Sequence, residues 1–151
     1  MVSIEERIVI PVPLAPAFAY YAEYAHIAEW DPGVERSRKR TSGPLKKGDC
    51  YDVVSLFFGQ KLPMTYEVIS LDAPRQIVLR GVSSTGVAVD DIRFRAIDAT
   101  TTGITWGLTL TLSGLGRFGE PFMKPLLTRL GRATMRGLQA SAAQGLPQRV
   151  A

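Results

Sequence analysis

The sequence has one cysteine, Cys50, and one histidine, His26, among its 151 residues. A single cysteine excludes an intrachain disulfide, and the two residues together cannot supply the three or four ligands of a Cys/His zinc site. We therefore expect no metal and no cofactor. A histidine-activated nucleophile would depend on His26 alone, and Asp49 and Asp52 beside Cys50 oppose formation of a reactive thiolate.

Long apolar runs are also lacking. The uncharged segment 8–22 contains prolines and is too short to span a bilayer, and the uncharged segment 99–116 is rich in Thr and Gly and alternates with a period of two. Glu5, Glu6 and Arg7 stand where the apolar core of a secretion signal would lie. These features, with the single cysteine, favour a cytoplasmic protein.

Acidic residues are absent from two regions, 36–48 and everything after Glu120, and the formal net charge is +4. Aromatic residues are not interleaved with the basic ones, as stacking platforms for bases would require, so we expect solvated faces and no nucleic-acid partner. A basic helix face could instead contact an anionic membrane surface weakly or guide an acidic ligand.

Apolar residues make up 46% of the chain and charged residues 21%, which is typical of one folded domain. We assign residues 1–146 to a single domain and 147–151 to a C-terminal tail. Alternating patterns predict strands at 3–12, 34–40, 48–58, 62–71, 75–82, 86–97 and 102–113. Helical spacing predicts one or two short helices within 14–30 and a long amphipathic helix over 121–145.

The order of these elements resembles that of the START-related helix-grip (SRPBCC) superfamily, in its polyketide cyclase/dehydrase-like branch. The resemblance is carried by Glu29–Val34 (EWDPGV), the strand start at Gly48, Leu71–Arg80, Thr101–Trp106 and the glycine-rich passage into the last helix. It implies an α+β fold in which a curved antiparallel sheet of about seven strands wraps around a long C-terminal helix, with two short helices after the first strand. It also implies an elongated apolar cavity between sheet and helix.

Strand alternation and the helix stripe direct a mostly apolar set of side chains toward this interior. The candidate ligand-binding residues are Tyr51, Ser55, Phe57, Met64, Tyr66, Leu79, Asp90, Phe94, Trp106, Leu108, Met123, Leu127 and Leu130. The same residues could also form a filled core. We favour a cavity, because Tyr and Trp seldom pack without room for their polar ends.

Asp90 has two interpretations. Its parity with Ile92 and Phe94 directs the carboxylate inward, where it could accept a ligand hydroxyl or act as a base. A turn or bulge in the stretch before it would leave it solvated like Asp91, and we favour this second interpretation. The motif GxGxxG at Gly114–Gly119 lacks the parallel strand and the later acid of a dinucleotide site, so we interpret it as a turn.

Three functions remain open. The first is binding of a hydrophobic or amphipathic small molecule, such as a lipid or polyketide. The second, which the resemblance implies, is a polyketide cyclase, aromatase or dehydratase, with Tyr66 and Asp90 as weak candidates for acid and base. The third is a regulatory or partner-binding domain with Glu29–Val34 and the basic strand at 34–40 as its surface, although Trp30 fits better as a plug between helix and strand. We expect a monomer or a homodimer.

Overall fold

The computed structural model describes residues 1–57 and 59–146, and the predicted tail lies outside them. The strands are β1 (Val2–Ile10), β2 (Val34–Lys39), β3 (Cys50–Phe57), β4 (Gln60–Asp72), β5 (Gln76–Ser83), β6 (Gly86–Asp98) and β7 (Thr101–Leu112). The helices are α1 (Leu14–Tyr21) and α2 (Glu120–Ala143), with two 3-10 helices, η1 (Tyr24–Glu29) and η2 (Gly114–Gly119). The predicted strands and helices are all present.

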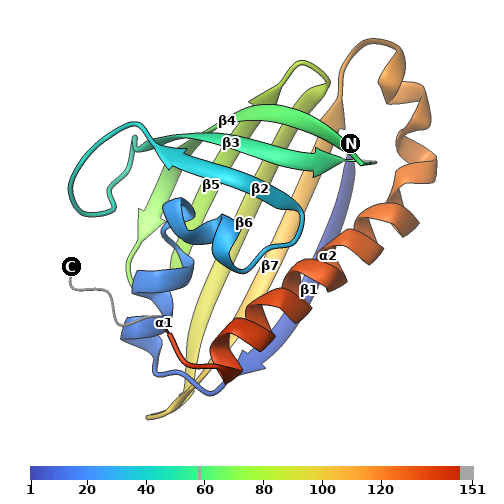
Figure 1. Cartoon of the computed structure of the whole chain (residues 1–151). Coiled ribbons are helices and arrows are strands. Elements are labelled where there is room, and N and C mark those ends of the chain that lie inside the picture. Colours follow the sequence, from blue (N-terminus) through green and yellow to red (C-terminus); the bar gives the residue numbers. More distant parts are fainter. Residues whose placement is uncertain (58, 147–151) are drawn as a thin grey trace.

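The seven strands form one sheet in the order β1-β7-β6-β5-β4-β3-β2, with every pair of neighbours antiparallel. Consecutive strands are neighbours throughout, except that β1 pairs with the last strand, β7. Figure 1 shows a strongly curved sheet with α2 lying across its concave side. This arrangement is the predicted α+β helix-grip fold.

Strand alternation separates the two faces of the sheet. In β1 every second residue is more buried than its neighbours, and in β7 Thr102, Ile104 and Trp106 are buried while the residues between them are partly exposed. Because successive side chains of a strand point to opposite faces, one face covers the core and the other meets solvent. The inner face is the one that meets α2.

Helix α2 buries one stripe against the sheet and η1 and exposes the other. The buried residues of the stripe are Met123, Leu127, Met135, Leu138 and Ala142. Helix α2 passes close to the backbone of Trp30 at Gly137, where an added Cβ would lie 2.1 Å from the Trp30 carbonyl oxygen. Only glycine permits this approach, so Gly137 fixes where α2 meets the end of η1.

Helices α1 and η1 close one end of the curved sheet with aromatic side chains. Phe18 packs edge-on against Phe94, with ring centroids 5.1 Å apart. Trp30 packs against Tyr21 at 5.6 Å and against Trp106 at 5.4 Å. Trp30 is only 5% exposed, as expected of a plug and not of a partner-binding surface.

Candidate functional site

A cavity of about 350 Å³ lies between the concave face of the sheet and α2. Its walls come from η1 and the residues after it, from β1, β3, β4, β6 and β7, and from the middle of α2. The volume falls within the range of small-molecule sites. The interior of this fold is therefore hollow, and the cavity interpretation of the sequence holds over the filled-core one.

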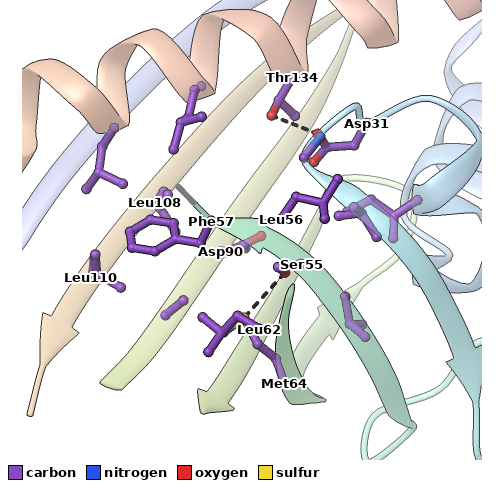
Figure 2. Close-up of a pocket in the computed structure, with 18 of the residues that line it drawn as sticks. Asp31, Ser55, Leu56, Phe57, Leu62, Met64, Asp90, Leu108, Leu110 and Thr134 are labelled. Carbon is purple, nitrogen blue, oxygen red and sulfur yellow. Dashed lines mark hydrogen bonds between the residues drawn. The ribbon is translucent and has the colours of Figure 1, made fainter. Parts of the chain in front are cut away.

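Most of the residues predicted to face the interior reach the cavity. Those that line it are Ser55, Phe57, Met64, Tyr66, Asp90, Trp106, Leu108, Leu127 and Leu130. Figure 2 shows Phe57, Leu62, Leu108 and Leu110 directed into the same space, below the helix that carries Thr134. Strands β3, β4 and β7 thus face α2 across the cavity.

Four predicted residues do not line the cavity. They are Tyr51, Leu79, Phe94 and Met123. Leu79 is fully buried in the sheet, and Phe94 belongs to the aromatic packing under α1. For the three strand residues, parity indicated which face of the sheet each side chain occupies. Parity could not indicate which neighbouring side chains pack over that face.

Tyr51 takes part instead in a buried polar network beneath η1. Its hydroxyl donates to Glu23 at 2.6 Å, and Lys39 bridges Glu23 at 2.9 Å and Asp49 at 3.3 Å. Burial alone would raise the pKa of Asp49, but hydrogen bonds from Thr41, the Lys46 N–H and Lys39 lower it to about 2. This network ties η1 to β2 and β3 and leaves Tyr51 no free hydroxyl for a ligand.

One end of the cavity is apolar and half-exposed; we call it the open end. It is formed by Leu56, Phe57, Leu62, Leu110 and Leu112, with Thr85 at its rim. Leu56 is 37% exposed and Thr85 is exposed, so solvent reaches this part of the cavity. Burial of a ligand's apolar surface against these side chains would favour binding by desolvation.

The other end is buried and polar; we call it the closed end. Asp90, on β6, lies here and is only 6% exposed. The hydroxyl of Tyr24, from η1, donates to Asp90 Oδ2, while Oδ1 is buried and has no hydrogen-bond partner among the described residues. A buried carboxylate oxygen without a donor is costly, and a ligand hydroxyl or amine would satisfy it.

The favoured interpretation of Asp90 as a solvated residue is wrong. Strand β6 pairs in continuous register with β5 and β7 through this region, and the first shift lies between Ala96 and Asp98. Without a bulge before Asp90, its parity with Ile92 holds and the carboxylate points inward. The turn at 84–85 ends before β6 begins at Gly86, so it does not change which face Asp90 occupies.

Burial raises the pKa of Asp90 to about 7. The hydrogen bond from Tyr24 and the nearby indole N–H of Trp106 act in the opposite direction, and the charge of Asp31 adds to the increase. A carboxyl group with this pKa exchanges its proton near neutral pH. Asp90 can therefore accept a hydrogen bond in one state and donate one in the other.

Two tyrosines stay protonated beside it. Burial raises the pKa of both Tyr24 and Tyr66 well above the usual value, and the charge of Asp90 raises them further. Their ring centroids are 5.3 Å apart. They can donate hydrogen bonds to a ligand or to Asp90, but they hold their protons too firmly to release them at neutral pH.

Asp31 lies where the chain leaves η1 and is 9% exposed. Its Oδ1 accepts from the Gly33 N–H at 2.8 Å and from the Thr134 hydroxyl of α2 at 3.1 Å (Figure 2). Burial raises its pKa, and these two hydrogen bonds lower it. Asp31 thus joins η1 to α2 on the cavity wall and adds a second buried carboxyl group near Asp90.

Sequence reasoning missed Tyr24 and Asp31 as cavity residues, whereas the helix stripe had directed Thr134 toward the interior. A signal for Asp31 existed, since Asp-Pro-Gly is typical of a side chain that caps its own turn. No comparable signal distinguishes Tyr24. Tyr20 and Tyr21 nearby are also tyrosines, and their side chains point elsewhere.

Other residues that carry chemistry lie away from the cavity. His26 stacks on Tyr20 with ring centroids 4.6 Å apart, Cys50 is half-buried at the start of β3, and the GxGxxG segment forms η2. In the described part of the chain, no cluster of three or more His, Cys, Asp or Glu side chains could hold a metal ion. Within the same residues, no helix has the length and hydropathy needed to cross a bilayer.

Comparisons with known proteins agree with this geometry. The model of a family described as "Polyketide cyclase / dehydrase and lipid transport" matches residues 1–143. No curated protein is significantly similar in sequence.

Solved structures share the fold at low identity. The Zhui aromatase/cyclase from a Streptomyces species is 15% identical, with a TM-score of 0.79, over 97% of this chain and 96% of that one. A START superfamily protein from Mycobacterium smegmatis is 10% identical, with a TM-score of 0.82, over 94% and 97% of the two chains. A protein from Thermus thermophilus is 13% identical, with a TM-score of 0.80, over 97% and 100%. At such identities the similarity shows the fold alone.

Proposed function

The chain belongs to the polyketide cyclase / dehydrase and lipid transport family, and we propose that it binds a hydrophobic or amphipathic small molecule in the cavity between the sheet and α2. The observation that carries this proposal is the division of the cavity into an apolar open end and a polar closed end. A ligand with one polar group would match both, because its apolar part leaves water while its polar group pairs with Asp90.

The orientation follows from the same division. The unpaired Oδ1 of Asp90 lies at the closed end, and the half-exposed leucines lie at the open end. The polar group of the ligand would therefore be the deeper one, placed against Asp90, Tyr24 and Tyr66. Desolvating that group costs free energy unless it finds a partner, and Asp90 provides one.

The experiment fills the cavity with a side chain. Leu110→Trp places an indole in the open end, and Thr111→Trp, on the next residue and the opposite, exposed face of β7, is the matched control. We expect wild type and Thr111→Trp to bind the amphipathic fluorophore 1-anilinonaphthalene-8-sulfonate and to be stabilised thermally by it, and Leu110→Trp to lose both effects.

Native mass spectrometry of the purified protein would identify a co-purifying molecule, which the Leu110→Trp variant should lack. If Leu110→Trp binds the fluorophore as the wild type does, or if no molecule from a panel of fatty acids, sterols and aromatic polyketides stabilises the wild type, the cavity is not a ligand site.

The second candidate is a cyclase, aromatase or dehydratase acting on a polyketide-like substrate, favoured by the pKa of Asp90 near 7. Such a group can remove a proton from a carbon next to a carbonyl and return it to a departing oxygen, while Tyr66 donates a hydrogen bond to the carbonyl and Tyr24 keeps its hydrogen bond to Asp90.

Asp90→Asn should abolish turnover of such a substrate and keep its binding, and Tyr66→Phe should slow turnover without loss of binding. Turnover that survives Asp90→Asn would exclude this mechanism. Turnover that Tyr66→Phe leaves unchanged would remove Tyr66 from it.

A further inference from the structure

Three large apolar side chains stand in solvent on η2 and the first turn of α2. Leu115, Phe118 and Phe122 are 85%, 69% and 82% exposed. Apart from Met1, the other exposed large apolar side chains of the described residues lie between 37% and 53%. Leu115, Phe118 and Phe122 are called the apolar tip below. The exposure of these side chains to water is unfavourable, and it indicates a surface that binds an apolar partner.

Positive charge surrounds the apolar tip. The Arg117 guanidinium lies 5.8 Å from the centre of the Phe118 ring, and the exposed Lys124 follows Phe122 by two residues. Residues 113–143 contain five basic residues and one acid, a net charge of +4 that equals the formal charge of the whole chain. The single acid, Glu120, is paired with the N-terminal amine. The apolar tip therefore lies at the start of the basic C-terminal segment, with Arg117 and Lys124 beside it.

The apolar tip adjoins the open end of the cavity. Leu112, which lines that end, donates its backbone N–H to Glu120 at 2.7 Å, and Ser113 donates to the carbonyl of Thr85 on the cavity rim at 2.9 Å. Figure 1 shows η2 and the start of α2 projecting beyond the ends of the sheet strands. No residue of the described ranges 1–57 and 59–146 covers Leu115, Phe118 or Phe122.

We propose that the apolar tip docks this protein onto an anionic lipid membrane, with its three side chains among the lipid headgroups and Arg117 and Lys124 against the phosphates. Such a membrane provides partners for both the apolar and the cationic side chains of this surface. Bulky apolar side chains enter the lipid–water interface, and cations bind the anionic lipid headgroups. A second copy of the chain fits less well, because a tip-to-tip contact would bring two regions of like charge together. The inference concerns this surface and does not depend on the proposed ligand.

Vesicle co-sedimentation tests the docking. Wild type should sediment with vesicles of phosphatidylcholine and phosphatidylglycerol, less with phosphatidylcholine alone, and less again in high salt. The variant Leu115→Ser/Phe118→Ser/Phe122→Ser should lose this association. Arg117→Gln/Lys124→Gln should weaken binding to the anionic vesicles by about fivefold for each charge removed.

Two control variants carry the same kinds of substitution away from the apolar tip. Ile97→Ser removes an apolar side chain that is 46% exposed on β6, and Arg80→Gln/Arg95→Gln removes two exposed charges from the sheet. Both should sediment as the wild type does. Circular dichroism and thermal unfolding should be unchanged in the tip variants, since the altered side chains are exposed.

Wild-type protein that stays in solution with every vesicle overturns the proposal. So does a triple serine variant that sediments as the wild type does. A third contrary result is a triple variant that converts a dimer to a monomer in light scattering while vesicle binding is unchanged, because the tip would then be an interface between copies of the chain.

Discussion

The two ends of the cavity are built on opposite principles. At the closed end, Asp90 and Asp31 are buried among aromatic rings, and one oxygen of Asp90 has no partner among the described residues. At the open end, leucines and Phe57 are left half-exposed, next to an apolar tip in solvent. One end carries polar groups that would be more stable in water, and the other carries apolar groups that would be more stable inside. The comparison teaches that the cavity changes from apolar to polar along its length, and the proposed amphipathic ligand rests on this division.

The largest expected effect concerns Asp90. The folded state holds its pKa near 7, above the ordinary value near 4, so the folded protein binds the proton more tightly and stability falls as pH rises from about 4 to about 7. Asp90→Asn removes this pH-dependent loss of folding stability. Its free energy of unfolding, relative to wild type, should rise by about 4 kcal/mol between pH 4 and pH 8. Urea unfolding at a series of pH values measures it.

Asp98, at the far end of the same strand, is the control of opposite sign. The Thr100 backbone N–H donates to it and lowers its pKa, so its stabilisation is present at high pH and lost as the pH falls. Asp98→Asn should therefore lose stability toward high pH. The titratable groups that face Asp90 are Tyr24, Tyr66 and Asp31, and all three remain in both variants. A flat difference curve for Asp90→Asn would contradict the polar closed end.

The next effect compares two glycines of α2. Gly137→Ala, at the closed end, places a Cβ 2.1 Å from the backbone oxygen of Trp30 and should cost about 3 kcal/mol, since neither backbone can yield easily. In Gly131→Ala, on the cavity wall, the new Cβ would lie 2.8 Å from the terminal methyl of Ile4 and 3.6 Å from Glu6 Cγ, both of them side-chain atoms. There the helix propensity of alanine offsets a small shift, and we expect roughly no change. Equal effects in thermal unfolding would mean that the closed end is no tighter than the rest.

A smaller effect separates two tyrosines of the closed end. Tyr24→Phe removes the hydrogen bond to Asp90 and leaves both carboxylate oxygens without a protein donor from η1, which should cost about 2 kcal/mol at pH 8. Tyr66→Phe is the matched control, because the Tyr66 hydroxyl makes no hydrogen bond with the described residues. It should change stability by less than about 0.5 kcal/mol. Equal losses in urea unfolding would show that Tyr66 also holds Asp90.

The smallest effect belongs to the open end. Leu112→Ala removes part of a half-buried side chain and should cost less than about 1 kcal/mol of folding stability. Because the same surface would cover a ligand, the affinity for the amphipathic fluorophore should fall about threefold. A fluorescence titration and a urea unfolding curve measure the two quantities. A large loss of stability with unchanged affinity would place Leu112 in the core of the fold.

The fold was predictable because its signals are local. The alternation of Ile104, Trp106 and Leu108 and the stripe of Leu127 and Leu138 follow from the period of a strand and of a helix. Turn residues between the strands then leave little choice but an antiparallel order. The inward direction of Tyr66, Met64 and Trp106 follows from the same parity, as long as no bulge intervenes.

The sequence by itself determined the strands, the long helix, the basic character of the C-terminal region and, apart from Asp90, the sheet face of the strand residues. The tertiary structure decided what those faces meet. It placed Tyr24 against Asp90 across 66 positions of the chain and Asp31 against Thr134 across 103, and it showed that the sheet and α2 enclose a space they do not fill. The physical reason is range: periodicity and turn chemistry act over a few residues, whereas burial, pKa and cavity shape depend on groups brought together only when the sheet curves around the helix.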